Sequence, residues 1–585
     1  MTKTKQTIFT MMFCLLMLLG LMVYIKMSPI WFFWFFASIL PVYVYTRYFA
    51  CHVFDEIKSS GTKNTLIMLF ACAMLAPIFY MSLIVRPFNG GRMSILVNLS
   101  FILILFVAIF ITVQKLLRID VEPKEQKNSK LDLLIFMLLP LTVYTYALMG
   151  VFPAVLSPDA IYIWTEIQNN AYNNAHPLLY VMLNKLLSLI WNYPAIMAIF
   201  QILLCSFTYA YVAWRFKKMG LPSIYCWLMI LVLTFVPCNL IYSITVFKDV
   251  PYTMALILLA VEYIRIFTDK AYFKKMGNLI LLGTIVLMVS LTRHNGMYVM
   301  ILCNALMGLV LLLRRHKKHA LRVALAAVAG IILFQGLFHL GVAILGDKYQ
   351  NNNHFTKTAI FAIPTQAMIA IYHDHWDELD IGQKERLYRY LDFDEVDNHI
   401  DKHLSRNMWR YYGAAKHTLN AEAVDEDVMQ FMGAYWNFLK AYPEDVLKSY
   451  LRMTSIVWCS QNYGYTGSFY FGIADFEDDY YVDIEPQVKS WHARGLLERT
   501  YGKRYLGALL WRPALPLLVI LLLLLAQRKG KRIPALMLAS PVFFNALGYL
   551  ATCESQDVRY LYINYSIMVM LFFYTVLNKK IKKEA

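Results

Sequence analysis

The chain has 585 residues, of which 59% are hydrophobic and only 16% are charged, and its mean hydropathy is +0.49. A soluble protein has about a quarter of its residues charged, so this composition excludes an ordinary water-soluble enzyme. The formal net charge of +17 is compatible with nucleic-acid binding. Excess lysine and arginine is, however, the usual signature of cytoplasmic loops in membrane proteins, and we expect no nucleic-acid partner.

The apolar residues come in runs of about twenty, the length needed to cross ~30 Å of hydrocarbon. Such runs must be helical, because lipid offers no partner to backbone N–H and C=O groups. The first run is too long for the apolar core of a signal peptide and lacks a small-residue cleavage site, which favours an uncleaved span. In chain order the predicted spans lie near residues 7–26, 29–46, 64–85, 93–117, 131–151, 195–214, 222–245, 250–268, 277–292, 297–313, 321–345, 508–526, 532–551 and 557–577.

The fold class predicted is therefore an all-α polytopic membrane protein with about 14 transmembrane helices. Basic clusters follow the fourth, sixth, tenth and twelfth spans, precede the ninth and form the C-terminal tail. With fourteen spans they all lie on one side, which predicts that both termini are cytoplasmic. Residues 177–190 are apolar but too short to cross, and Asn184 and Lys185 interrupt them, so we expect an interfacial helix on the outer surface.

This topology divides the chain into four parts. Residues 1–130 form a block of four spans, and residues 131–346 form a transmembrane core whose first outer loop is 152–194. Residues 347–507 form an extracytoplasmic domain, in which apolar residues at three- and four-residue intervals predict helices, with Asp380 and Glu444 at helix starts. Residues 508–585 contain three spans and a basic tail. The acidic run 475–485 matches no known calcium loop, and we favour a solvated surface.

Two acids lie where predicted spans meet the outer surface. Asp159 stands in the sequence Ser-Pro-Asp-Ala at the start of a predicted helix, and capping that helix is the alternative to a catalytic role. Lys248 and Asp249 adjoin each other before a proline, and the alternative there is a locally neutralised pair at the interface. The first outer loop also contains His176.

Two further groups add cations at the same face. Arg293 and His294 precede Asn-Gly, which suffices for a turn by itself, so turn chemistry leaves the two side chains unexplained. Arg559 and Tyr560 lie at the outer start of the last span. Acids that serve as general bases, beside cations that bind phosphate, are what group transfer from a phosphate ester needs. At the lipid boundary the phosphate would belong to a lipid.

From about residue 131 the layout resembles the GT-C superfamily of membrane glycosyltransferases, which includes protein O-mannosyltransferases and the aminoarabinose transferase of lipid A. The resemblance rests on Asp159, on His176-Pro177 with the helix after it, on Lys248-Asp249 and on Arg293. The sequences HPLLY, FKDVPY and RHNG are closest to an uncharacterised bacterial group of this type. The four N-terminal spans are not part of that core.

This resemblance implies a GT-C-type glycosyltransferase that moves a sugar from a polyprenyl-phosphate-linked donor to a glycan, lipid or protein acceptor. It implies catalytic roles for Asp159, Asp249 and His176, and substrate binding by Lys248 and Arg293. The location of the other polar groups at the same face adds His294, Arg559 and Tyr560 to the expected substrate-binding residues. We expect no obligatory cofactor or metal, although Asp249 could hold a divalent ion. The implied location is the bacterial plasma membrane, with an extracytoplasmic active site. The alternatives are a lipid-linked glycan polymerase or ligase, and a transporter that performs no chemistry.

Overall fold

The computed structural model describes residues 10, 31–83, 95–124, 129–350, 360–394, 396, 418–460, 504–553 and 557–577. Within them, helices form nearly all the regular structure, and the four strands are two-residue segments that pair in parallel, β1 with β3 and β2 with β4. Among the described residues, eight helices are long and apolar enough to cross a membrane, or nine if one bent pair is a single span. The chain is therefore an all-α polytopic membrane protein. The predicted span at 7–26 lies outside the described residues.

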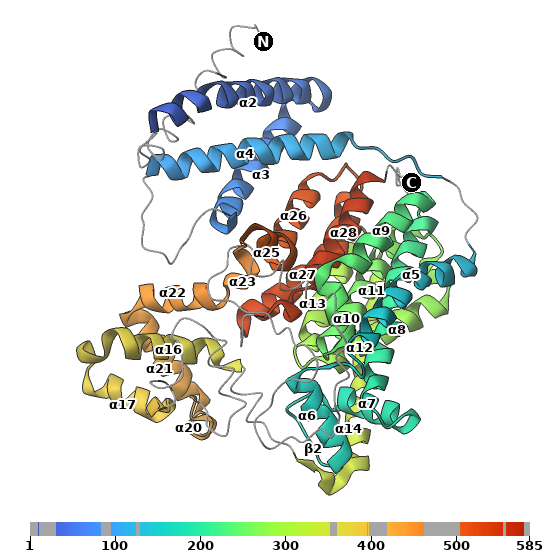
Figure 1. Cartoon of the computed structure of the whole chain (residues 1–585), viewed down its shortest axis with the longest axis vertical. Coiled ribbons are helices and arrows are strands. Elements are labelled where there is room, and N and C mark those ends of the chain that lie inside the picture. The colour runs from blue at the N-terminus through green and yellow to red at the C-terminus, as the bar shows by residue number, and fades with distance from the viewer. Residues whose placement is uncertain are drawn as a thin grey trace.

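The N-terminal block contains α2 (Trp31–Ser60), α3 (Thr62–Leu83) and α4 (Ile95–Arg118). Helix α2 runs well past residue 46, where the predicted second span ended. The three helices pack on one another, and their apolar cluster includes Leu518 and Ala526 from the C-terminal part of the chain. In Figure 1 this block, drawn in blue, lies beside α26.

The core is built around α11 (Asp249–Thr268), whose side chains are almost all buried. Helices α8 (Ala195–Lys218), α12 (Met276–Thr292) and α27 (Arg532–Ala551) pack against it, and α5 (Lys130–Met149) packs on α8. Helix α13 (Gly296–Leu313) contacts α12, and α14 (Lys317–Leu345) packs on both but leaves most of its surface exposed. The 3₁₀ turn η1 (Tyr272–Lys274) joins α11 to α12. Figure 1 shows α8, α11, α12 and α13 bundled in green beside the red C-terminal helices, which include α27.

The predicted span at 222–245 is not one straight helix. Helix α9 (Ser223–Phe235) ends before Pro237, and α10 (Pro237–Ile244) continues at an angle of 61°. Proline cannot donate the helical hydrogen bond and disfavours the α conformation of the residue before it, and Val236 accordingly has ψ 122°. The chain after α10 enters β3 (Thr245–Val246) and then the start of α11.

The loop between α5 and α8 contains β1 (Val155–Leu156), α6 (Pro158–Asn169), β2 (Tyr172–Asn173) and α7 (Leu178–Ile190). Helix α7 confirms that residues 178–190 form a separate short helix, and Leu186, Leu189 and Ile190 leave one of its faces exposed. Strand β2 pairs with β4 (Tyr349–Gln350), which follows the 3₁₀ turn η2 (Gly346–Lys348) after α14. The loop is thereby tied to the end of the core.

The described part of residues 347–507 is helical, as predicted. It contains α16 (Ala362–His375), η3 (Trp376–Glu378), α17 (Ile381–Tyr390), α20 (Ala421–Glu426), α21 (Val428–Ala441), α22 (Pro443–Met453) and α23 (Ser455–Trp458). Asp380 caps α17 in a capping box with Gln383, and Glu444 lies in the first turn of α22, so both helix starts are confirmed. The acidic run 475–485 lies outside the described residues.

The C-terminal part differs from prediction in two places. The span expected at 508–526 is two helices, α25 (Arg504–Trp511) and α26 (Ala514–Leu525), because Pro513 interrupts the hydrogen bonding. The span expected at 557–577 begins with the 3₁₀ turn η4 (Val558–Tyr560), and helix α28 (Ile563–Val576) follows it.

Candidate active site

Two short strands bring the first outer loop to the start of α11. Strands β1 and β3 pair in parallel, with Val155 opposite Thr245 and Leu156 opposite Val246. The Ser157 hydroxyl donates to the Val246 carbonyl at 2.8 Å, and the Gln201 side-chain amide donates to three carbonyls in the segment 242–245. Since Asp159 follows β1 closely and Lys248 follows β3 closely, this pairing places the two side chains together.

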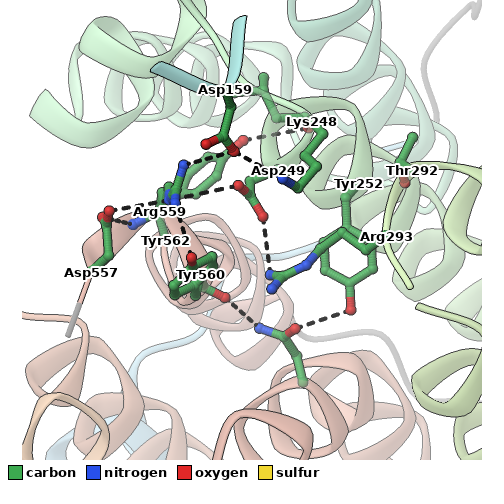
Figure 2. A network of polar contacts seen from close by, with 12 residues as sticks. Asp159, Lys248, Asp249, Tyr252, Thr292, Arg293, Asp557, Arg559, Tyr560 and Tyr562 are labelled. Atoms are coloured by element: carbon green, nitrogen blue, oxygen red, sulfur yellow. Dashed lines mark hydrogen bonds and ion pairs between the residues drawn. The ribbon is translucent and has the colours of Figure 1, made fainter. Parts of the chain in front are cut away.

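Asp159 forms ion pairs with two cations. Its Oδ2 lies 2.8 Å from Lys248 Nζ and 3.2 Å from Arg559 Nη1, as Figure 2 shows. Helix capping, the alternative role considered for Asp159, belongs to Ser157, whose hydroxyl accepts from the Ala160 N–H. Burial by itself would raise the pKa of Asp159, but Lys248 and Arg559 outweigh it and hold this pKa well below its usual range.

Both predicted histidines lie beside Lys248 and are neutral. Lys248 Nζ is 2.9 Å from His176 Nδ1, and since an ammonium can only donate, the proton of His176 is on Nε2. Burial and Lys248 lower the pKa of His176 to about 3 despite Asp159, and burial and Lys248 lower that of His294 to about 4. His294 hydrogen-bonds the backbone of Asn174 and Ala175, so it holds the loop that carries His176.

Asp249 is fully buried between two arginines. Its Oδ1 lies 3.0 Å from Arg293 Nη1, and its Oδ2 lies 3.8 Å from Arg559 Nε. Neither oxygen accepts a hydrogen bond from the described residues. Arg559 is also held by Asp557, whose Oδ2 lies 3.1 Å from its Nε and whose Oδ1 accepts its backbone N–H at 2.9 Å. Asp249 therefore neutralises both arginines through charge.

Aromatic rings enclose the guanidinium groups. Arg293 lies over the rings of Tyr252 and Tyr560, with Cζ 5.4 and 4.6 Å from their centroids, and Arg559 lies 4.7 Å from the Phe247 centroid. Arg559 also donates to the Tyr560 hydroxyl at 2.9 Å. Asn545 connects this frame by accepting from the Tyr252 hydroxyl at 3.0 Å and donating to the Tyr560 carbonyl at 2.7 Å.

The structure thus brings all eight predicted site residues into one region, at the end of the core where α11 and α13 begin and α12 ends. Prediction gave no role to three further residues of this network, namely Asp557, which lies in the same candidate segment as Arg559 and Tyr560, and Tyr252 and Asn545. Asp557 stands two residues before Arg559, and an acid so close to a predicted cation was a usable signal. Tyr252 and Asn545 carried none, since a tyrosine and an asparagine inside apolar helices have many other roles.

The network contains three acids, Asp159, Asp249 and Asp557, and three cations, Lys248, Arg293 and Arg559. The three cations are largely shielded from water, and each is paired with a carboxylate that neutralises it. Each carboxylate therefore occupies a position in which an anion is stabilised. Another anion can take that position only if it supplies comparable charge-assisted contacts, and phosphate is such an anion. Within the described part of the chain, no group of three or more His, Cys, Asp and Glu side chains has the arrangement of a metal site.

The fold and the site define a polytopic membrane protein with a buried ion-pair network at one end of its helix bundle. The model for a family of unknown function (DUF6020) matches residues 144–495, and the chain belongs to this family. The match includes Asp159, His176, Lys248, Asp249, Arg293 and His294. It ends before Arg559 and Tyr560. No curated protein and no solved structure matches the chain.

Proposed function

We propose that this protein is a glycosyltransferase of the GT-C type, with about 14 spans, that takes a sugar from a polyprenyl-phosphate-linked donor. The observation that carries the proposal is the convergence of Asp159, Lys248, Asp249, Arg293 and Arg559 from four separate segments into one network. Charged groups next to hydrocarbon cost several kcal/mol, so they are rare and are mostly retained where they have a function. A structural ion pair needs two groups, whereas this site gathers three of each sign.

The reaction is a displacement at the anomeric carbon. An acceptor hydroxyl oxygen forms a bond to that carbon while the bond from carbon to the phosphate oxygen breaks, and the polyprenyl phosphate leaves with the bonding electrons. The hydroxyl proton passes to Asp159 and then to solvent or to the departing phosphate. Lys248, Arg293 and Arg559 stabilise the negative charge that grows on the phosphate, and arginine's planar fork suits two phosphate oxygens at once.

The ion pairs of Asp159 explain how donor binding would prepare the base. While Lys248 and Arg559 hold its carboxylate, the pKa of Asp159 is far below the range in which a carboxylate accepts a proton efficiently. A donor phosphate competes for the same two cations. As they turn to the phosphate, the pKa of Asp159 rises towards its ordinary value, so the base becomes effective only when the donor is present.

The remaining groups keep this arrangement in place. Asp249 neutralises Arg293 and is too deeply buried to reach an acceptor, so it orients the cations and does not take the proton. His176 directs Nδ1 to Lys248, and this leaves its Nε2–H available to donate to the sugar or the phosphate. We assign the site to the extracytoplasmic face of a bacterial plasma membrane, with cytoplasmic termini, because basic clusters gather at the opposite loops.

The proposal is tested with the purified full-length chain in lipid nanodiscs that contain a polyprenyl-phosphate-linked sugar and a lipid or glycan acceptor. The measurement is the polyprenyl phosphate released. The proposal predicts release that depends on the acceptor and is lost in Lys248→Ala, but not in Lys317→Ala, which removes an exposed lysine at the other end of the core. A transporter would move the lipid and release none.

A further inference from the structure

A second group of cations lies at the other end of the core. Arg215 and Lys218 are in the last turn of α8, Arg265 is in the last turn of α11, and Lys275 immediately precedes α12. Lys218 is close enough to the other three to experience their repulsion. At 1.5 Å per residue, Arg265 lies about 24 Å further along α11 than Asp249, so this cluster is separate from the candidate active site.

The cations of this cluster differ in how they are neutralised. Arg265 Nη1 is paired with Glu262, and Arg265 Nη2 lies 3.9 Å from the Asp269 carboxylate. Within the described residues, Arg215 and Lys218 form no ion pair, and the buried Nε of Arg215 has no hydrogen-bond partner. The neighbouring Lys217 points elsewhere, to Asp132 at 2.8 Å. Asp269 attracts Lys218 less strongly than Arg215, Arg265 and Lys275 repel it, and a bound anion would relieve the remaining repulsion.

Aromatic rings hold Arg215 and Lys218 in position. The Arg215 guanidinium lies 4.7 Å from the Tyr211 centroid and 4.5 Å from the Trp214 centroid, and Lys218 Nζ lies 3.5 Å from the latter. The Trp214 indole is fixed by its hydrogen bond to the Ser129 carbonyl at 3.0 Å. Cation–π contacts use the faces of the rings and leave the N–H donors of the cations available to an anion.

An apolar stripe on α8 leads away from these cations. Leu203, Phe207, Trp214 and Lys218 are spaced by four, seven and four residues, and such spacing puts side chains on one helix face. Leu203 is 44% exposed and Phe207 is 39% exposed, so this face is open to the hydrocarbon of a membrane. The stripe therefore combines an apolar surface with a cationic end, which is the pattern of a phospholipid with its acyl chain and phosphate.

We propose that Arg215, Lys218 and Lys275 bind the phosphate of an anionic phospholipid whose acyl chain lies along Leu203 and Phe207. Basic pockets between transmembrane helices are a recurrent form of such sites. The arginine fork and two ammonium groups supply charge-assisted hydrogen bonds to phosphate oxygens. Free phosphate shares this chemistry with the lipid headgroup, but it would gain nothing from the apolar stripe.

The test is retention of lipid by the full-length protein in native mass spectrometry, after reconstitution with equal amounts of phosphatidylglycerol and phosphatidylcholine. We expect the protein to retain phosphatidylglycerol preferentially. Arg215→Gln/Lys218→Gln should weaken retention about thirtyfold, since each basic residue near a membrane surface contributes a factor of about five. The matched control, Lys317→Gln/Lys318→Gln, removes two exposed charges from the same end of the core and should retain lipid as the unaltered protein does.

The charge-preserving exchange Arg215→Lys/Lys218→Arg covers the case in which the double variant folds poorly, because it should retain most of the lipid. Equal loss in the matched control would mean general attraction between a basic surface and anionic lipid, and would overturn the proposal. Undiminished retention by Arg215→Gln/Lys218→Gln would do the same. If inorganic phosphate displaced the lipid at millimolar concentration, the acyl chain would contribute nothing, and the lipid would be the wrong ligand.

Discussion

Replacing Asp159 by asparagine separates a catalytic carboxylate from a structural one. The substitution keeps the side-chain size and leaves the helix cap intact, because Ser157 and not Asp159 caps α6. It removes the negative charge shared by Lys248 and Arg559. Breaking a buried ion pair costs about 3–5 kcal/mol when one partner is left alone. Here the asparagine oxygen still accepts from Lys248 and Asp557 still neutralises Arg559, so we expect a loss of about 2 kcal/mol.

The effect on transfer should be much larger than the effect on stability. Removing a general base lowers the rate by about 10²- to 10⁴-fold. Binding of polyprenyl phosphate should be undiminished or tighter, because the variant no longer supplies a carboxylate that competes with phosphate for Lys248 and Arg559. The assay is therefore a pair of measurements: the transfer rate at saturating donor, and the affinity for polyprenyl phosphate.

Asp132 provides the matched control. It forms an ion pair with Lys217 at 2.8 Å, the same separation as Asp159 and Lys248, but near the start of α5, away from the candidate active site. Asp132→Asn should lower the thermal unfolding midpoint modestly and leave transfer unchanged. A folded Asp159→Asn protein that transferred sugar at the rate of the unaltered protein would refute the assignment of the base. The base would then have to be another group.

Three further predictions test separate parts of the account. Arg293→Lys should reduce transfer more than the retained charge suggests, because a planar fork is replaced by a point charge, and unchanged donor-dependent kinetics would assign Arg293 to structure only. A reporter that is active only outside the cytoplasm should be active when fused after about residue 420 and silent when fused at Gly530, and the reverse pattern would place the site on the other face. Burial raises the pKa of Glu166 from 4.5 to about 8, so between these values the folded protein binds more protons than the unfolded one and its stability falls as pH rises. Glu166→Gln should remove that fall in thermal unfolding scans from pH 5 to pH 9, and a persistent fall would show that another group causes it.

The sequence predicted most of the helices because spans are specified locally. A run of about twenty apolar residues has to be helical in lipid, whatever the rest of the chain does. Prediction missed the breaks where a proline interrupts such a run, at Pro237 and Pro513, since an apolar composition does not reveal a bend. Because a span needs about twenty apolar residues, the shorter run at residues 178–190 was identified as a separate short helix.

The candidate site was predicted residue by residue, but its connections were not. Charge next to hydrocarbon is a rare and visible signal, and it identified Asp159, Asp249 and Arg559. The pairing of β1 with β3 involves two residues on each strand, and the Gln201 amide reaches carbonyls about forty positions away. Contacts of that kind depend on how distant helices pack, and no local pattern of the sequence records them.

The most direct test of the central claim is the structure of the purified protein with a polyprenyl-phosphate-linked sugar bound. The account predicts that the donor phosphate lies between Lys248, Arg293 and Arg559, and that Asp159 has separated from the two cations that hold it and faces the anomeric carbon. A donor bound elsewhere on the protein, with the ion pairs of Asp159 still intact, would contradict it.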